Sequence, residues 1–181
     1  MIDRASALEL VRRRAPNENL FKHMLAVEAV MRALARHFGE DEEVWGLTGL
    51  LHDLDYAQTV DDFARHGYVT CEELEGKLPP EALHAILAHP GHVPAESRLD
   101  WALYCSDPVT GLVVAAVLMH PSHRLSEYRL KSLKKRFKDK RFAAGADRDQ
   151  ISTCEKIGLQ LDEFLALALE AMTGIADELG F

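Results

Sequence analysis

The chain has too few cysteines, and the wrong spacing between them, for a disulfide-bonded fold. Its three cysteines are an odd number and form no C-x-x-C pair. Disulfide frameworks need paired cysteines and an oxidising compartment. We therefore exclude a disulfide scaffold and predict a cytoplasmic location.

A long apolar run is also missing. The longest apolar stretch, residues 109–119, contains Thr110 and Gly111 and is shorter than the ~20 residues that span a bilayer. The N-terminal segment mixes Asp3, Glu9 and four arginines with apolar positions, whereas a signal peptide has an uninterrupted apolar core. We expect neither a membrane span nor a secretion signal.

The signatures of several large enzyme classes are absent as well. The sequence contains no G-x-x-x-x-G-K-[ST], no G-x-S-x-G and no H-E-x-x-H. These patterns mark P-loop nucleotidases, α/β hydrolases and zincin proteases, so those classes are disfavoured. Period-two alternation, hairpin dipeptides and internal repeats are missing too, which argues against a β fold and a solenoid.

Helical periodicity is present instead. Apolar residues recur every three or four positions over residues 20–38, between a capping Asn17 and Gly39. Similar patterns predict helices over residues 44–54, from Asp61 or Asp62 to about Gly76, over 80–90, from Asp147, and over 164–179. We predict an all-α fold in which residues 1–181 form one helical bundle domain, with irregular structure at 90–94 and in the basic segment 124–141.

Histidine is abundant, and the surroundings of one His-Asp pair indicate a site. The chain has nine histidines, and imidazole is the commonest metal ligand. His52 and Asp53 follow the second apolar pattern; neighbours on a helix point about 100° apart, so both reach one ion only where another element crosses closely. Gly46 and Gly49 offer a flat face for that element. A carboxylate directed inward, as we expect for Asp53, needs a partner or a metal.

Other histidines and a second aspartate extend this pair to a set of ligands. His23 lies near the start of the first long helix, and Asp107 follows much later in the chain. Two imidazoles with two carboxylates suit Mn, Fe, Co, Ni, Zn or Mg. His66 and His89 lie on helices that face the same core and are candidates to hold a second ion, with Asp53 as the bridge. We therefore expect one or two ions per chain.

Asp107 also has an alternative role. Pro108 biases it away from helical geometry, and aspartate is a favoured N-cap, with Thr110 three residues further on. A helix that begins here would be capped by Asp107, in place of metal binding.

The order His, His-Asp, Asp, carried by His23, His52-Asp53 and Asp107, resembles the HD superfamily of metal-dependent phosphohydrolases. The resemblance covers most of the chain. Four stretches are similar to a compact bacterial subgroup of predicted HD hydrolases: NLFKHMLAVE (19–28), GLLHDLDY (49–56), DPVTGL (107–112) and KKRFKDK (134–140). It implies an HD-type bundle with those four residues as primary metal ligands. His66 and His89 match the additional histidines of the binuclear branch.

The resemblance also implies a chemistry. A hydrolase of this class cleaves a phosphomonoester or phosphodiester in a small phosphorylated substrate, such as a nucleotide, with metal-activated water. Asp53 would also accept a proton from that water, and Asp55 is a candidate for acid–base or outer-sphere work. The binuclear branch includes di-iron oxygenases that use four His and two Asp, so an oxygenase is the alternative. A metal-stabilised regulatory module without catalysis is the third reading.

The charge is unevenly placed along the chain. The formal net charge is -8, but residues 124–141 hold nine Lys or Arg against two acidic residues, a net charge of +7, which leaves -15 elsewhere. A solvated helix face and recruitment of phosphate to the metal both explain this segment. Its aromatic residues are too sparse for a stacking platform, so no nucleic-acid partner is expected. Lys22, beside His23, is another candidate for a phosphate contact.

Overall fold

The computed structural model describes residues 1–181, and all of its regular elements are helices. The α-helices are α1 (Arg4–Arg14), α2 (Glu18–Phe38), α3 (Glu42–Leu51), α4 (Tyr56–Thr59), α5 (Tyr68–Leu74), α6 (Pro80–Ala88), α7 (Arg98–Leu118), α8 (Leu130–Lys138), α9 (Arg148–Ser152), α10 (Leu161–Thr173) and α11 (Ala176–Leu179). Short 3-10 turns lie at Phe63–Arg65, Leu125–Glu127 and Thr153–Ile157. The predicted all-α fold is confirmed.

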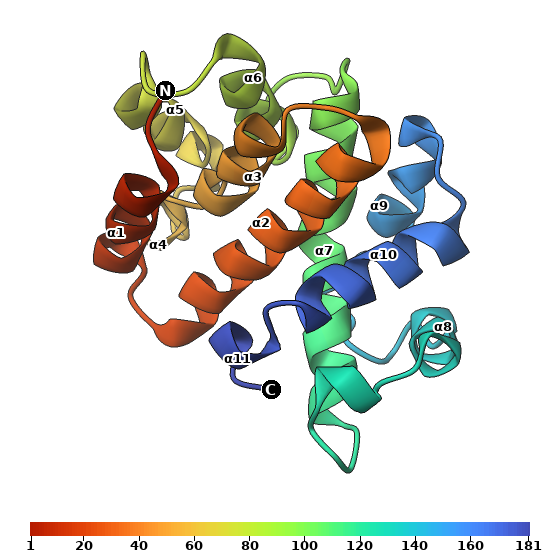
Figure 1. The fold of residues 1–181 in the computed structure, drawn as a ribbon. Helices are drawn as coiled ribbons and strands as arrows, with labels where there is room; N and C mark the ends of the chain where they lie inside the picture. Colours follow the sequence, from red (N-terminus) through yellow and green to blue (C-terminus); the bar gives the residue numbers. More distant parts are fainter.

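Two long helices, α2 and α7, cross in the middle of the molecule (Figure 1). α1 and α3 to α6 lie on one side of them, and α8 and α9 lie on the other side. α10 lies between α8 and α9. One hydrophobic core extends from Ala7 in α1 to Leu179 in α11 and includes the inner faces of both long helices. Side chains on α2 and α7 are therefore held in fixed positions by packing on both sides.

α2 forms where the sequence pattern predicts it. The side chain of Asn17 accepts a hydrogen bond from the backbone N–H of Leu20, and Gly39 ends the helix with a φ of 71°. Glycine has no Cβ penalty in this left-handed region. The periodic apolar residues, including Met24 and Met31, are buried. These features confirm the predicted ends of the helix.

A glycine in α3 allows close packing on α2, as predicted. A Cβ added at Gly49 would lie 3.0 Å from the carbonyl oxygen of Val27 and 3.1 Å from Cα of Glu28, both backbone atoms of α2. Such contacts are tighter than nearly all real Cβ contacts, so a larger residue at this position would push the two helices apart. The close approach brings His52, at the end of α3, beside the helix that carries His23.

α7 contains Pro108 in its interior, so the alternative role of Asp107 as a helix cap is wrong. The helix begins at a Ser97 capping box and continues through Asp107. Proline has no N–H for the carbonyl four residues back, which belongs to Tyr104. Nε2 of Gln150, in α9, donates to that carbonyl at 2.8 Å. A distant side chain thus replaces the missing backbone hydrogen bond.

Several predicted boundaries are wrong. The helix expected over 44–54 ends at Leu51, and residues 52–55 form a turn. After Asp61 a 3-10 turn comes first, and α5 begins only after Gly67, whose φ of 81° interrupts the helix. The basic segment is irregular only in part, because residues 130–138 form α8 around the buried Leu133. The last helix is divided at Gly174 into α10 and α11.

α7 is long and apolar enough to cross a membrane by length and composition alone. In the structure, most of its apolar stretch is buried against the rest of the chain. A helix that is apolar on most sides is typical of the core of a protein as well as of a membrane span. The sequence-based expectation considered only residues 109–119, which are half of this helix.

Candidate metal centre

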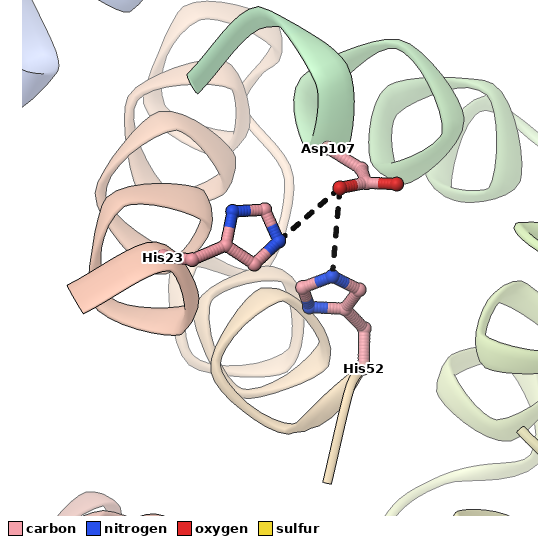
Figure 2. Close-up of side chains that lie close together, drawn as sticks. All are labelled: His23, His52 and Asp107. Carbon is pink, nitrogen blue, oxygen red and sulfur yellow. Dashed lines mark ion pairs between the residues drawn. The ribbon is translucent and has the colours of Figure 1, made fainter. Parts of the chain in front are cut away.

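Three helices bring polar side chains together at one cavity. His23 comes from α2, His52 directly follows α3, and Asp107 comes from α7 (Figure 2). Nε2 of His23 lies 3.2 Å from Oδ1 of Asp107, and Nε2 of His52 lies 3.9 Å from the same oxygen. Figure 2 shows both rings directed toward that carboxylate. Three sequence motifs that are far apart in the chain therefore meet.

Asp53 lies at the centre of this cluster. Its Oδ2 is 3.6 Å from Nε2 of His23. Its Oδ1 is 3.5, 3.2 and 3.5 Å from Nε2 of His52, His66 and His89. The two oxygens face different histidines, as the predicted bridging position requires. All six candidate ligands lie in one cluster.

Hydrogen bonds on the outer side of the rings determine which nitrogen points inward. Nδ1 of His52 donates to the carbonyl of Gly49 at 2.8 Å, and Nδ1 of His89 donates to the carbonyl of Ile86 at 2.6 Å. Because a carbonyl only accepts, both Nδ1 atoms carry the hydrogen. Both Nε2 atoms therefore present a lone pair to the cluster.

His23 and His66 are oriented in the same way by side chains. Nδ1 of His66 donates to Oδ1 of Asp55 at 2.7 Å. Nδ1 of His23 lies 3.1 Å from the hydroxyl of Thr110, which donates its own hydrogen to the carbonyl of Asp107 and so accepts from the ring. Outer hydrogen bonds of this kind keep metal-binding histidines in one tautomer.

This donor set fits a divalent metal ion. Nε2 of His52 is buried and has no hydrogen-bond partner, and Nε2 of His66 faces Nε2 of His89 at 3.1 Å. The buried lone pair of His52 without a donor is costly, and a cation held there beside the carboxylates removes this cost. His66 and His89 share a hydrogen in their contact, which a metal ion would replace. Two groups of ligand atoms lie close enough to share an ion: His23, His52 and Asp107, and His52, Asp53 and His89.

Electrostatics keep the central carboxylate ionised and one imidazole neutral. Burial lowers the pKa of His52 to about 4, because it disfavours the charged ring. Burial also opposes ionisation of Asp53, but the histidines around it outweigh this effect and hold its pKa well below the usual value. Burial opposes charge on His66 too, yet Asp53 and Asp55 raise the pKa of that ring to about 9. Neutral imidazoles and ionised carboxylates are the forms that bind metal, so binding at His66 would release a proton.

Asp55 is buried, and both of its oxygens are engaged. Besides its bond to His66, it accepts hydrogen bonds from the backbone N–H of Gly67 at 2.8 Å and of Thr70 at 2.9 Å. Asp55 therefore holds both the start of α5 and the ring of His66. This arrangement favours the outer-sphere part of its predicted role over the acid–base part.

A cavity of about 550 Å³ opens beside the cluster, and five of the six candidate ligands line it. Tyr56, Phe63 and Gln150 also line it. No local pattern marks these three residues, because tertiary folding alone brings them there. No lysine or arginine lines the cavity, so the basic segment makes no contact with it. The Nζ atom of Lys22 lies near Gly180 instead.

Comparison with known proteins relates most of the chain to one family. Residues 20–157 match the family model described as HD domain. The chain is 26% identical over 170 residues to Ribonuclease Y of Sulfurovum sp. (strain NBC37-1), an alignment that covers 91% of this chain and 33% of that protein. The chain thus spans about a third of the length of the curated relative it matches. No solved structure matches the chain significantly.

Proposed function

This chain belongs to the HD domain family, and from that membership we propose that it hydrolyses a phosphoester in a small phosphorylated substrate such as a nucleotide. The family is part of a superfamily of metal-dependent phosphohydrolases, and HD domains bind divalent metals. The convergence of four imidazole Nε2 atoms and two carboxylates at one cavity is the observation that carries the proposal.

The residues of the cluster have two kinds of role: some would bind the metal, and others hold the metal ligands in place. The six ligands would hold one or two ions. The two groups of ligand atoms share His52, and Asp53, whose two oxygens face different histidines, would be the bridge. A divalent ion bound there polarises a phosphoryl oxygen and acidifies a water molecule. Asp55 keeps His66 in place, and Thr110 keeps His23 in place. The low pKa of Asp53 favours its role as a ligand over its predicted role as a proton acceptor.

The cavity wall supports a phosphodiester that carries a planar or apolar group. Tyr56 and Phe63 are 39% and 53% exposed, and their rings lie 5.7 and 5.0 Å from that of His66. Rings of this kind offer stacking surfaces for an aromatic group. With no Lys or Arg in the lining, a singly charged diester suits the cavity better than a multiply charged monoester. The name of the relative, Ribonuclease Y, also denotes a nuclease.

A second candidate is an oxygenase with two irons in the same cluster. The observation that favours it is the grouping of four histidines and two aspartates around Asp53. Uptake of oxygen by iron-loaded protein that depends on an organic substrate, without release of phosphate or alcohol from esters, would assign this chemistry. A regulatory module would instead gain thermal stability from metal and show no turnover in either assay.

The test is metal-dependent hydrolysis by the purified chain. Metal-free protein is loaded in turn with Mn, Fe, Co, Ni, Zn or Mg and assayed with bis(p-nitrophenyl) phosphate and p-nitrophenyl phosphate, and bound metal is measured by elemental analysis. We expect hydrolysis, faster for the diester, that is lost in Asp53→Asn and retained in Asp61→Asn, an exposed carboxylate of the next turn. A loaded cluster without hydrolysis, or full activity in Asp53→Asn, would refute the proposal.

A further inference from the structure

A second polar cavity, of about 360 Å³, lies between the C-terminal end of α7 and α8. It shares no residue with the cavity of the metal centre. Its lining consists of Ala116, Met119, His120, Pro121, Tyr128, Ser132, Lys135, Arg136 and Asp139. Ala116 lies nine residues after Asp107 on α7, which is roughly 14 Å along a helix axis. A ligand here is therefore remote from the metal ligands.

The cations of this cavity form no ion pair, unlike other cations of the basic segment 124–141. Lys134 pairs with Asp162 at 2.5 Å, and Arg124 pairs with Glu127 at 3.9 Å. Lys135 and Arg136 form no ion pair. Two cations without ion pairs therefore lie on one concave wall, whereas the chain outside the basic segment carries a net negative charge.

One acidic residue is also present on the wall. Asp139 lies 3.8 Å from Arg141, which is outside the cavity. Lys135 and Arg136 form no ion pair with Asp139, so the wall keeps an excess of positive charge.

Neutral hydrogen-bond donors accompany the two cations. The hydroxyl of Ser132 lines the cavity from the first turn of α8. Nδ1 of His120 lies 2.8 Å from the hydroxyl of Ser122 and 3.4 Å from its backbone nitrogen, so Nδ1 is engaged in this turn and Nε2 is the ring nitrogen left for a ligand. The ring of His120 packs edge-on against buried Tyr128, with 5.4 Å between ring centroids. Cations with hydroxyl and imidazole donors are the groups that bind phosphate oxygens.

The end of α8 is held firmly, so the wall is a built surface. Arg148 is 7% exposed, and its guanidinium donates to the carbonyls of Phe137 at 3.2 Å and Ala143 at 2.8 Å. The guanidinium of Arg136 lies 4.6 Å from the centre of the Phe142 ring. These contacts fix the backbone after α8 and hold Arg136 against Phe142.

We propose that the cavity between α7 and α8 binds the phosphate or pyrophosphate group of a small anionic ligand, at a site separate from the metal centre. The proposal does not depend on the proposed hydrolase activity. A nucleic-acid strand fits less well, because Tyr128 is buried and Phe142 lies beneath Arg136, which leaves no exposed ring for base stacking.

The test is calorimetric titration of the full chain with inorganic pyrophosphate and with inorganic phosphate. Lys135→Ala removes a cation of the wall. Lys131→Ala removes an exposed cation of the same helix that is outside the lining, so it is the matched control. We expect affinity to fall about tenfold in Lys135→Ala and less than twofold in Lys131→Ala, since one charge-assisted hydrogen bond contributes about this much. Ser132→Ala, which keeps all charges, should also weaken binding.

Pyrophosphate also binds metals, so the same titration is run on Asp53→Asn, with circular dichroism as the check on folding. Binding that persists in Asp53→Asn supports the separate site, and binding that disappears there assigns the ligand to the metal centre and overturns the proposal. Equal weakening by Lys135→Ala and Lys131→Ala would show diffuse attraction to α8, and no binding at all would equally reject the site. Tighter binding of a single-stranded oligonucleotide than of pyrophosphate would assign the surface to nucleic acid.

Discussion

The metal centre and the cavity between α7 and α8 lie at two positions along one helix and are built in opposite ways. In the metal centre, the central side chains are buried and each histidine has an outer hydrogen bond. In the second cavity, Lys135 and Ser132 are exposed, and no partner orients the lysine. The first site is organised by the core before any ligand arrives, whereas the second depends on a local density of charge.

This difference predicts how strongly single substitutions affect each site. A buried ligand set cannot lose one member without leaving the others unpaired, so single substitutions there have large effects. Exposed cations are screened by solvent and salt, and each contributes modestly. Two substitutions in the metal centre test this contrast against Lys135→Ala, and two more test the helix packing that positions the metal centre.

The largest effect is expected from removal of a buried ligand. His52→Ala deletes an imidazole whose Nε2 has no other partner. We expect loss of bound metal and a fall in kcat/KM greater than the roughly 10- to 100-fold caused by loss of outer hydrogen bonds. Elemental analysis and the diester assay measure both quantities. Lys135→Ala is the comparison and should keep both; full metal content in His52→Ala would contradict the assignment.

Removal of an outer partner should have the next largest effect. Asp55→Asn replaces an acceptor of three hydrogen bonds by an amide, so His66 loses its orientation. We expect metal affinity to fall about 10- to 100-fold, measured by competition with a chelating dye. Asp62→Asn, an exposed residue of the same segment, is the control. Unchanged affinity in Asp55→Asn would show that the outer bond does not hold the ring.

A change in the contact between α2 and α3 should reduce stability. Gly49→Ala places a Cβ against the backbone of α2, and we expect a loss of about 1–3 kcal/mol in the free energy of unfolding. Gly111→Ala is the control, because a Cβ there meets nothing within 4 Å and alanine favours the helix. Urea unfolding measures both variants. Equal stability of the two would mean that the helices separate without cost.

The smallest effect is the expected coupling of about 1 kcal/mol between Gln150 and the proline in α7. Gln150→Leu leaves the carbonyl of Tyr104 without its donor, at a cost of about 1–3 kcal/mol if no water replaces it. In a Pro108→Ala background the backbone N–H is restored, so the cost of Gln150→Leu should shrink by about 1 kcal/mol. A double-mutant cycle of unfolding free energies measures this coupling, and strict additivity would disprove it.

Local chemistry explains which elements could be predicted. Both ends of α2 are marked by residues next to them, Asn17 and Gly39, so the sequence pattern locates the helix correctly. The start of α5 depends on Gly67, whose N–H is held by Asp55 twelve residues earlier. A window of sequence does not contain such a contact, so the predicted helix start at Asp61 or Asp62 is wrong although the helix itself exists as α5.

The same limit applies at Asp107. Pro108 indicates a helix start when only its neighbours are considered. The helix continues through it because Gln150 donates to the freed carbonyl from another helix. Likewise, half of the basic segment forms a helix because Leu133 has a core to pack against.

The amino-acid sequence by itself determined the class of the fold and the types of ligand, because helical periodicity and the chemistry of imidazole and carboxylate groups are properties of residues in order. Tertiary structure alone decided that Asp53 lies between the histidines, which nitrogen of each ring faces inward, and that the basic segment borders a different cavity. These features depend on contacts between residues far apart in the chain. Packing of α2, α3 and α7 around one core produces them, and no local pattern contains that information.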